Sequence, residues 1–197
     1  MNRIDCKHWF FIFALCFNWT LSTQSLAQAE SKSVDTKKVH AAIKKMLNFA
    51  LRKKNQESLK YIGVDTMVHM LLGHQEKNIS SEQKEKFKEL VKRNIELRAF
   101  PIVEEHFKSV DIPLEKPQVK NEQIWVKSSL LWGGSEQVNF TWILQKVDGQ
   151  YVITDFLNSK GQSSMVQNQK KIQKMIETDG MDKLLSNFEE QLTKLKK

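Results

Sequence analysis

The chain has 197 residues, which is enough for one packed domain, and its formal net charge at pH 7 is +8. Seven Gly and three Pro argue against a loop-dominated or low-complexity protein. A basic chain can bind nucleic acid, an anionic membrane surface or an acidic protein, and the net charge alone does not choose among them.

Residues 1–29 are predicted to be a cleaved secretory signal. Arg3 and Lys7 precede the apolar run Trp9–Phe17, which is too short to cross a bilayer as a helix. Ala27-Gln28-Ala29 then has the small–any–small pattern of a cleavage site, so we expect cleavage after Ala29. The remaining residues, 30–197, are expected to form a single domain in the bacterial periplasm.

Removal of this signal also changes the chemistry of the chain. Both cysteines, Cys6 and Cys16, lie within it, so the mature chain is expected to have neither disulfide nor thiol chemistry. The loss of two cations and one anion lowers the net charge from +8 to +7. Because exported basic proteins rarely act on nucleic acid, we expect a membrane or an acidic protein as the partner, and no nucleic acid.

Helical periodicity dominates the first half of the mature chain. Residues 34–54 and 57–72 carry apolar side chains at spacings of three and four, and Gly73 is expected to end the second helix. Ser80 or Ser81 is expected to cap a third helix, with a stripe that includes Phe87 and Val91. Pro101 is expected to kink or divide that helix.

Turn signals predict an antiparallel meander next. The sequence Gly-Gly-Ser-Glu joins strands 123–132 and 137–147, and Asp148-Gly149 joins the second strand to a third that begins at Tyr151. Residues near 109–119 can add a fourth strand at an edge. Amphipathic helices follow Gly161, so the order predicts an α+β fold, a twisted antiparallel meander packed with N-terminal and C-terminal helices.

The expected register defines the two faces of the sheet. Symmetric turns place Leu144 opposite both Ile153 and Trp125, and Trp142 opposite Asp155 and Lys127. One face then collects Trp125, Leu131, Val138, Phe140, Trp142, Leu144, Tyr151, Ile153 and Leu157, and the other collects Val126, Leu130, Trp132, Ile143, Val152 and Phe156.

Both expected faces are substantially apolar, although a sheet with one solvated face should alternate. Either helices cover both sides, or part of the aromatic face lines a cavity for an apolar ligand. The periodicity does not separate these alternatives.

Motifs for catalysis or metal binding are absent from the sequence. His69 and His74 are five residues apart, so on a helix they point roughly 140° apart and cannot share one metal. Asp155 is a carboxylate among aromatic residues, and it is interpreted either as a polar anchor at a cavity mouth, paired with Lys127, or as a structural acceptor for the following loop. We therefore predict no catalytic residue, no metal site and no cofactor.

Two ordered blocks of the sequence resemble the MlaC-like, or toluene-tolerance, family of periplasmic phospholipid-binding proteins. The first is LLGHQEKNISSEQKEKFKELVKRNI. The second is FTWILQKVDGQYVITDFLNSKGQSSMVQNQKKIQKMIETDGMDKLLSNF, which contains Phe140, Trp142, Tyr151, Asp155 and Gly161 at the positions of the family pattern. The resemblance implies an NTF2-like or cystatin-like sheet with a helical layer.

The resemblance also implies a function. Such a protein is an auxiliary component of an ABC-type lipid transport system that maintains outer-membrane lipid asymmetry. It shuttles a phospholipid, or in some relatives a hopanoid, between an outer-membrane lipoprotein–porin complex and an inner-membrane ABC transporter with an MCE ring. The phospholipid is cargo rather than cofactor, and the carrier is not an enzyme.

The acyl chains are expected in a dry hollow between the sheet and the helices. The expected lipid-binding residues are Phe87, Val91, Trp125, Phe140, Trp142, Leu144, Tyr151, Ile153 and Met165. Two alternatives stay open: an exported adaptor that binds only a protein and fills the aromatic face with its own side chains, and a hydrolase that depends on Asp155 or a histidine.

Overall fold

The structure is a computed structural model that describes residues 34–107, 111–132 and 135–195. The predicted signal peptide and its cleavage site lie outside these residues. In chain order the elements are α1 (Thr36–Leu51), α2 (Asn55–Leu59), α3 (Val64–Leu72), the 3₁₀ turn η2 (Gly73–Asn78), α4 (Ser81–Asn94), the π-helical turn η3 (Ile95–Ala99), α5 (Phe100–His106), β1 (Gln118–Lys120), β2 (Gln123–Trp132), β3 (Glu136–Val147), β4 (Gln150–Leu157), α6 (Ser164–Asp179) and α7 (Met181–Lys194).

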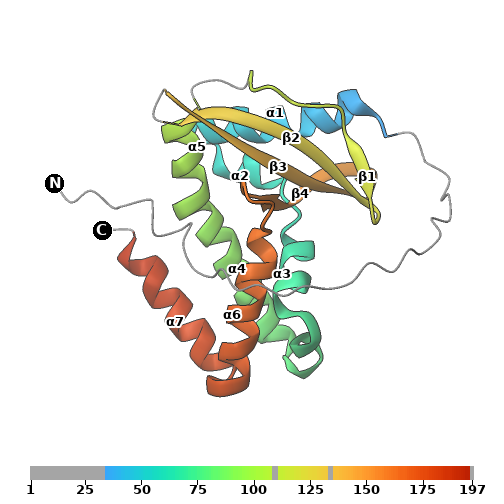
Figure 1. Ribbon diagram of the computed structural model, residues 1–197. Helices are drawn as coiled ribbons and strands as arrows, with labels where there is room; N and C mark the ends of the chain where they lie inside the picture. The colour runs from blue at the N-terminus through green and yellow to red at the C-terminus, as the bar shows by residue number, and fades with distance from the viewer. Residues whose placement is uncertain (1–33, 108–110, 133–134, 196–197) are drawn as a thin grey trace. The chain divides into compact units, whose positions relative to one another are not determined.

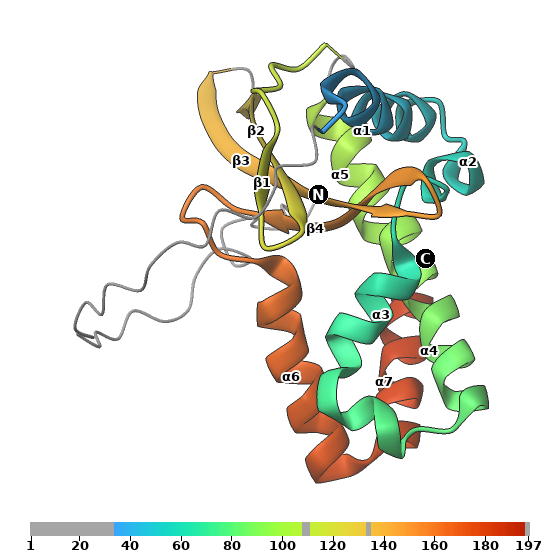
Figure 2. The same ribbon diagram turned by 90° about the vertical axis from the view of Figure 1, so that its right-hand side faces the viewer.

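The helices divide into two groups around the sheet (Figure 1). Helices α1 and α5 pack against each other and against the strands, whereas α3, α4, α6 and α7 contact one another and extend away from the β4 side of the sheet. Figure 2 shows the same separation from the side, with α6 and α7 descending beside α3 and α4. One apolar core runs through both groups, which confirms the predicted α+β class with helices on the sheet.

Local sequence explains where the main helices begin. Asp35 caps α1 by accepting a hydrogen bond from the Lys38 backbone N–H. Ser80 caps α4, and its side chain and that of Gln83 each bind the other's backbone N–H in a capping box. The predicted cap at Ser80 is therefore confirmed.

The single helix predicted over residues 57–72 is wrong, because the chain adds to the sheet in the middle of this segment. Ile153 of β4 donates its N–H to the Tyr61 carbonyl over 2.8 Å, and Gly63 donates to the Ile153 carbonyl over 2.9 Å. A Cβ at Gly63 would lie 2.9 Å from methyl carbons of Thr154 and Val152, so only glycine fits. This segment covers the free edge of β4.

The sheet is a four-stranded antiparallel meander in the order β1-β2-β3-β4. The predicted central strands are confirmed, and β1 is the expected additional edge strand. The predicted register between β2 and β3 is wrong by one residue, because Trp132 pairs with Glu136 and the connection has three residues instead of an even number. Val126 therefore lies opposite Trp142, and Trp125 lies opposite Ile143.

A β-bulge changes the second register. Leu144 pairs with Ile153 as predicted, but the next pair is Ile143 with Asp155, so Thr154 is an extra residue in β4. The buried Thr154 hydroxyl donates to the Ile143 carbonyl over 3.4 Å. Beyond the bulge Phe156, rather than Asp155, pairs with Trp142, which moves Phe156 to the other face from the one predicted.

These two register changes sort the side chains more clearly than the sequence predicted. Ile124, Val126, Phe140, Trp142, Leu144, Tyr151 and Ile153 lie on the face that joins the helical core. The opposite face is polar and exposed along the outer parts of β2 and β3, where Lys127, Gln137 and Asn139 lie. Its buried apolar side chains, Ile143 and Val152, lie toward β4, and Trp125 and the exposed Leu131 of β2 interrupt the polar part, so the sheet is not apolar on both faces throughout.

Candidate functional site

Four aromatic rings form a cluster on the core-facing side of the sheet. Phe140 and Trp142 come from β3, Phe156 from β4 and Phe107 from the end of α5. The centroid of the Trp142 ring lies 5.3 Å from that of Phe140, 5.5 Å from that of Phe156 and 6.3 Å from that of Phe107. These separations are typical of packed aromatic pairs.

The cluster closes the space where a hollow was expected. The Phe107 ring lies over β3, with its centroid 6.1 Å from that of Phe140, and Phe140 stacks on Phe156 at 4.9 Å. Phe107 is 6% exposed and Trp142 is 5% exposed. The rings of the protein itself therefore occupy this part of the expected hollow, and an acyl chain could lie against Trp142 only after a side chain of the cluster had moved.

The Trp142 indole carries a polar group in this apolar cluster. Its Nε1 atom is buried and has no hydrogen-bond partner among the described residues. The Trp142 ring is nearly perpendicular to those of Phe140 and Phe156, at 78° and 80°. A buried donor without a partner costs about 1–3 kcal/mol, so its presence in the core requires an explanation.

The connection between α4 and α5 deviates from regular helix close to this cluster. The π-helical turn Ile95–Ala99 separates the two helices, and Pro101 follows in the first turn of α5. Proline has no N–H to continue the helical hydrogen bonds, and π turns commonly mark functional sites. The prediction that Pro101 divides the helix is confirmed. Only the short helix α5 separates this division from Phe107.

Asp155 organises the loop that leads from β4 into α6. Its Oδ1 atom accepts from the backbone N–H of Phe156 over 2.6 Å and of Met165 over 3.1 Å, and from the Ser164 hydroxyl over 3.1 Å. Its Oδ2 atom accepts from the hydroxyl of Ser163, the N-cap of α6. Of the two interpretations of Asp155, these contacts favour the second, in which it is a structural acceptor for the following loop. Its pairing with Lys127 is wrong, because Lys127 lies opposite Thr141 and is exposed.

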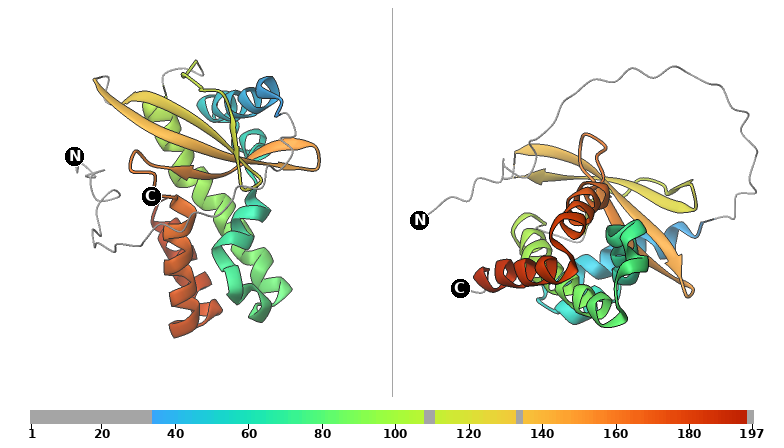
Figure 3. Two further views of the ribbon diagram at one scale, coloured as in Figure 1. Left: turned by 45° about the vertical axis from the view of Figure 1, so that its right-hand side comes forward. Right: turned by 90° about the horizontal axis from the view of Figure 1, so that it is seen from below.

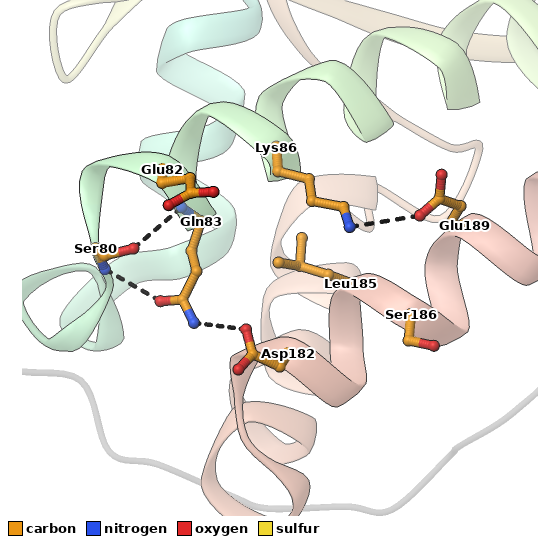
Figure 4. Close-up of a pocket in the computed structure, with 8 residues that line it drawn as sticks. All are labelled: Ser80, Glu82, Gln83, Lys86, Asp182, Leu185, Ser186 and Glu189. Atoms are coloured by element: carbon orange, nitrogen blue, oxygen red, sulfur yellow. Dashed lines mark hydrogen bonds and ion pairs between the residues drawn. The ribbon is translucent and has the colours of Figure 1, made fainter.

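Two clefts lie elsewhere on the described part of the chain. One, of about 540 Å³, lies between α4 and α7 and is lined mostly by polar side chains (Figure 4). Gln83 bridges it to Asp182 over 2.7 Å and Lys86 to Glu189 over 3.5 Å, so four of its polar side chains are already paired across it. The second, of about 380 Å³, lies beside the Asp148-Gly149 turn and is lined by Ile62, Val152, Lys88 and others. Neither includes a residue of the aromatic cluster.

The described residues contain no group of three or more His, Cys, Asp or Glu side chains placed to hold a metal ion. Among the helices that the structure describes, none is long and apolar enough to cross a membrane.

Comparison with known proteins identifies the family of this chain. A model of the MlaC protein family matches residues 23–190. The chain belongs to the MlaC family. No curated protein matches the sequence. Among solved structures, the MlaC-family chain is similar to a phospholipid-binding protein from Ralstonia solanacearum, whose structure was determined in complex with a phospholipid. The two share 15% sequence identity and a TM-score of 0.65, and the match covers 84% of this chain and all of the other, so it shows a common fold.

The MlaC-family fold brings five of the nine expected lipid-binding residues onto one surface. Phe140, Trp142, Leu144, Tyr151 and Ile153 share the core-facing side of the sheet. Trp125 does not: the register places it on the opposite face, where the Lys120 ammonium lies 4.6 Å from the centre of its ring.

The three expected helical residues lie in different surroundings. Phe87 is fully buried and its ring packs against Phe188 of α7, in the helical group that extends away from the sheet. Val91 is buried one turn further along α4. Met165 is half-buried in the first turn of α6, where its backbone is held by Asp155.

Sequence reasoning missed two rings of the cluster, Phe107 and Phe156. Phe156 was placed on the wrong face because the bulge was not predicted. The consecutive polar residues Thr154 and Asp155 in an otherwise apolar strand were the available signal. Phe107 carried no such signal, because only the path of α5 across the sheet brings it over β3.

Proposed function

We propose that this protein is a phospholipid carrier that holds the acyl chains of its cargo against the core-facing side of the sheet. Membership in the MlaC family carries the proposal, and the phospholipid in the Ralstonia solanacearum structure of the same fold supports it. The aromatic cluster supplies a continuous apolar surface for the chains. Carriage makes and breaks no bond, so the proposed role is not that of an enzyme.

The energies involved favour a shielded carrier. Each buried CH₂ group contributes about 0.8 kcal/mol, so two chains of about 15 carbons resist exposure to water by roughly 20 kcal/mol or more. Exchange between the carrier and a bilayer is different, because the acyl chains are surrounded by apolar groups both before and after the transfer. The hydrophobic free energies of the two states therefore nearly cancel. The cost of parting Phe107 from the sheet, about 3–5 kcal/mol if its burial is lost, must then be offset by contacts with the lipid itself.

The α4–α5 connection supplies a place for that parting. Movement of the seven-residue helix α5 about the π-helical turn would separate Phe107 from Phe140 and Trp142 without disturbing the strands. When the lipid leaves, the rings would close again and avoid exposing a large apolar patch to water. In this proposal, closure of the aromatic cluster favours release of the lipid, and the free energy needed to open the cluster opposes binding.

The proposed setting is the periplasm, after removal of residues 1–29. There the protein would exchange lipid with an inner-membrane MCE-domain ABC transporter complex and an outer-membrane lipoprotein–porin complex. Basic side chains support an encounter with acidic partners: Lys170, Lys171 and Lys174 are exposed on α6, and none forms an ion pair with a described residue. Unpaired surface charge of one sign steers association and makes its rate sensitive to salt.

Lipid extraction tests the proposal. The protein is exported in a Gram-negative host, purified from the periplasm without detergent, extracted with organic solvent and examined by mass spectrometry. We expect phospholipid in an amount comparable to the protein, and uptake of labelled phospholipid from vesicles. A protein that is both empty and unable to take up lipid would refute the proposal.

A second candidate, an exported adaptor that binds only a protein, is favoured by one observation. The aromatic face is filled by Phe107 and Phe156, as an adaptor requires. The two candidates differ in lipid content: an adaptor should be isolated without phospholipid and should take none up from vesicles, whereas a carrier should contain phospholipid and take it up.

A further inference from the structure

Trp142 combines two properties that burial in a hydrocarbon core does not explain. The side chain is 5% exposed and surrounded by three phenyl rings, yet its indole N–H has no acceptor among the described residues. A phenylalanine at this position would be apolar throughout and would bring no unpaired donor into the cluster. The indole is therefore expected to have a use when the cluster is occupied by something other than its own rings.

We propose that the Trp142 indole N–H donates a hydrogen bond to an ester carbonyl oxygen of the bound phospholipid. This inference rests on the proposed function and names the chemical group of the lipid that the site recognises. A phospholipid offers two kinds of acceptor, phosphate oxygens and ester carbonyls. Burying a charged phosphate among phenyl rings is costly, whereas an ester carbonyl is neutral and is attached directly to the acyl chain.

The geometry assigns a position to the cargo. An ester carbonyl at Trp142 puts the start of an acyl chain at the middle of β3, beside Phe140 and Phe156. The chain can then continue along the apolar face toward Leu144 and Ile153, which are paired across β3 and β4. The hydrogen bond also offsets part of the cost of moving Phe107, because it satisfies a donor that is unpaired in the closed cluster.

The chain contains a matched control. Trp125 is also a tryptophan in the sheet whose buried Nε1 atom has no partner, but it lies on the opposite face, where Lys120 covers its ring. Trp142→Phe and Trp125→Phe therefore make the same chemical change on the two sides of one sheet. Each removes a buried unpaired donor, so neither is expected to lower the stability of the lipid-free protein by that loss.

The experiment compares an ester lipid with an ether lipid. Wild-type protein, Trp142→Phe and Trp125→Phe are titrated with dipalmitoyl phosphatidylglycerol and with its dihexadecyl ether analogue, which has the same headgroup and chain length and no carbonyl. We expect wild-type and Trp125→Phe to bind the ester lipid about five- to tenfold more tightly than the ether lipid, and Trp142→Phe to bind both alike.

Each outcome decides one point. Equal affinity of the wild-type protein for both lipids overturns the role of the indole and leaves the carrier function standing, since both lipids bind. An ester preference that survives in Trp142→Phe overturns it as well, because the donor then lies elsewhere. Failure of the wild-type protein to bind either lipid refutes the carrier function itself. If Trp142→Phe does not fold, the affinities of the wild-type protein for the ester and ether lipids still decide whether a carbonyl is recognised.

Discussion

Removal of the Asp155 carboxylate should destabilise the protein through the loop between β4 and α6. Four donors converge on this side chain: the backbone N–H groups of Phe156 and Met165 and the hydroxyls of Ser163 and Ser164. The hydroxyls can rotate toward other acceptors, but the two backbone donors cannot. Asp155 is 4% exposed, so water does not replace the lost acceptor without local opening.

The magnitude follows from these contacts. Two unsatisfied backbone donors at about 1–3 kcal/mol each predict a loss of about 2–6 kcal/mol of unfolding free energy for Asp155→Ala. Asp155→Asn keeps one oxygen in place of Oδ1 and loses only the charge and the second oxygen, so we expect a loss of about 1–2 kcal/mol. Urea unfolding followed by tryptophan fluorescence measures both, against a total stability of about 5–15 kcal/mol.

The same pair of variants separates structure from chemistry. If Asp155→Ala unfolds within about 0.5 kcal/mol of the wild-type protein, which is the range of an ordinary surface substitution, the assignment of Asp155 as the organiser of this loop is refuted. Folded Asp155→Asn should carry lipid as the wild-type protein does. A folded variant without lipid binding would instead indicate that the carboxylate meets the cargo.

Three further changes test other parts of the structure. Gly73→Ala should lower the unfolding free energy measured in urea by about 1–3 kcal/mol, because Gly73 has φ +51° and an added Cβ would lie 2.1 Å from Gln173 Nε2. An unchanged midpoint of urea unfolding would contradict this packing of α6 on α3. Lys84 lowers the pKa of Glu76 by donating a hydrogen bond to it. Lys84→Met should therefore lower the unfolding free energy by up to about 1 kcal/mol at pH 7, because the pair is partly exposed, and this difference from wild type should fade as the pH falls below 4.5. A difference that does not change with pH would count against the pair. Phe107→Ala should lower stability by about 3–5 kcal/mol and speed lipid exchange with vesicles, and slower exchange would argue against α5 as the moving part.

The sequence predicted the elements well because their signals are local. The periodicity of α1, the serine and glutamine of the α4 capping box and the Asp148-Gly149 turn each depend on residues within a few positions of one another. The ordered motifs were sufficient to identify the family, which the family model confirms over residues 23–190. Figure 3 shows these elements in two further views.

The composition of the sheet faces could not be predicted in the same way, because it depends on the number of residues in one connection and on one β-bulge. A three-residue link between Trp132 and Glu136 and one extra residue at Thr154 each reverse the faces beyond that point. Trp125 was therefore assigned to the aromatic face and Phe156 to the other, and both assignments were wrong. Loop parity and bulges are set by tertiary packing that no single strand encodes.

The role of Gly63 was likewise invisible in the sequence. Apolar spacing continues through residues 57–72 as in one helix, yet the backbone of Tyr61–Gly63 pairs with Ile153, ninety residues away in a strand. The closed aromatic cluster has the same origin, since Phe107 and Phe140 meet only through the tertiary path of α5. Long-range contacts of this kind leave no periodic signal in either partner.

The central claim is that acyl chains lie against the aromatic face of the sheet, and quenching by brominated lipid tests it most directly. Trp125→Phe combined with Trp132→Phe leaves Trp142 as the one tryptophan of the mature chain, since Trp9 and Trp19 belong to the predicted signal. Bromine quenches tryptophan fluorescence only at close contact. We expect phospholipid brominated within its acyl chains to quench Trp142 in proportion to the lipid bound. Stoichiometric binding of that lipid with unchanged Trp142 emission would contradict the account.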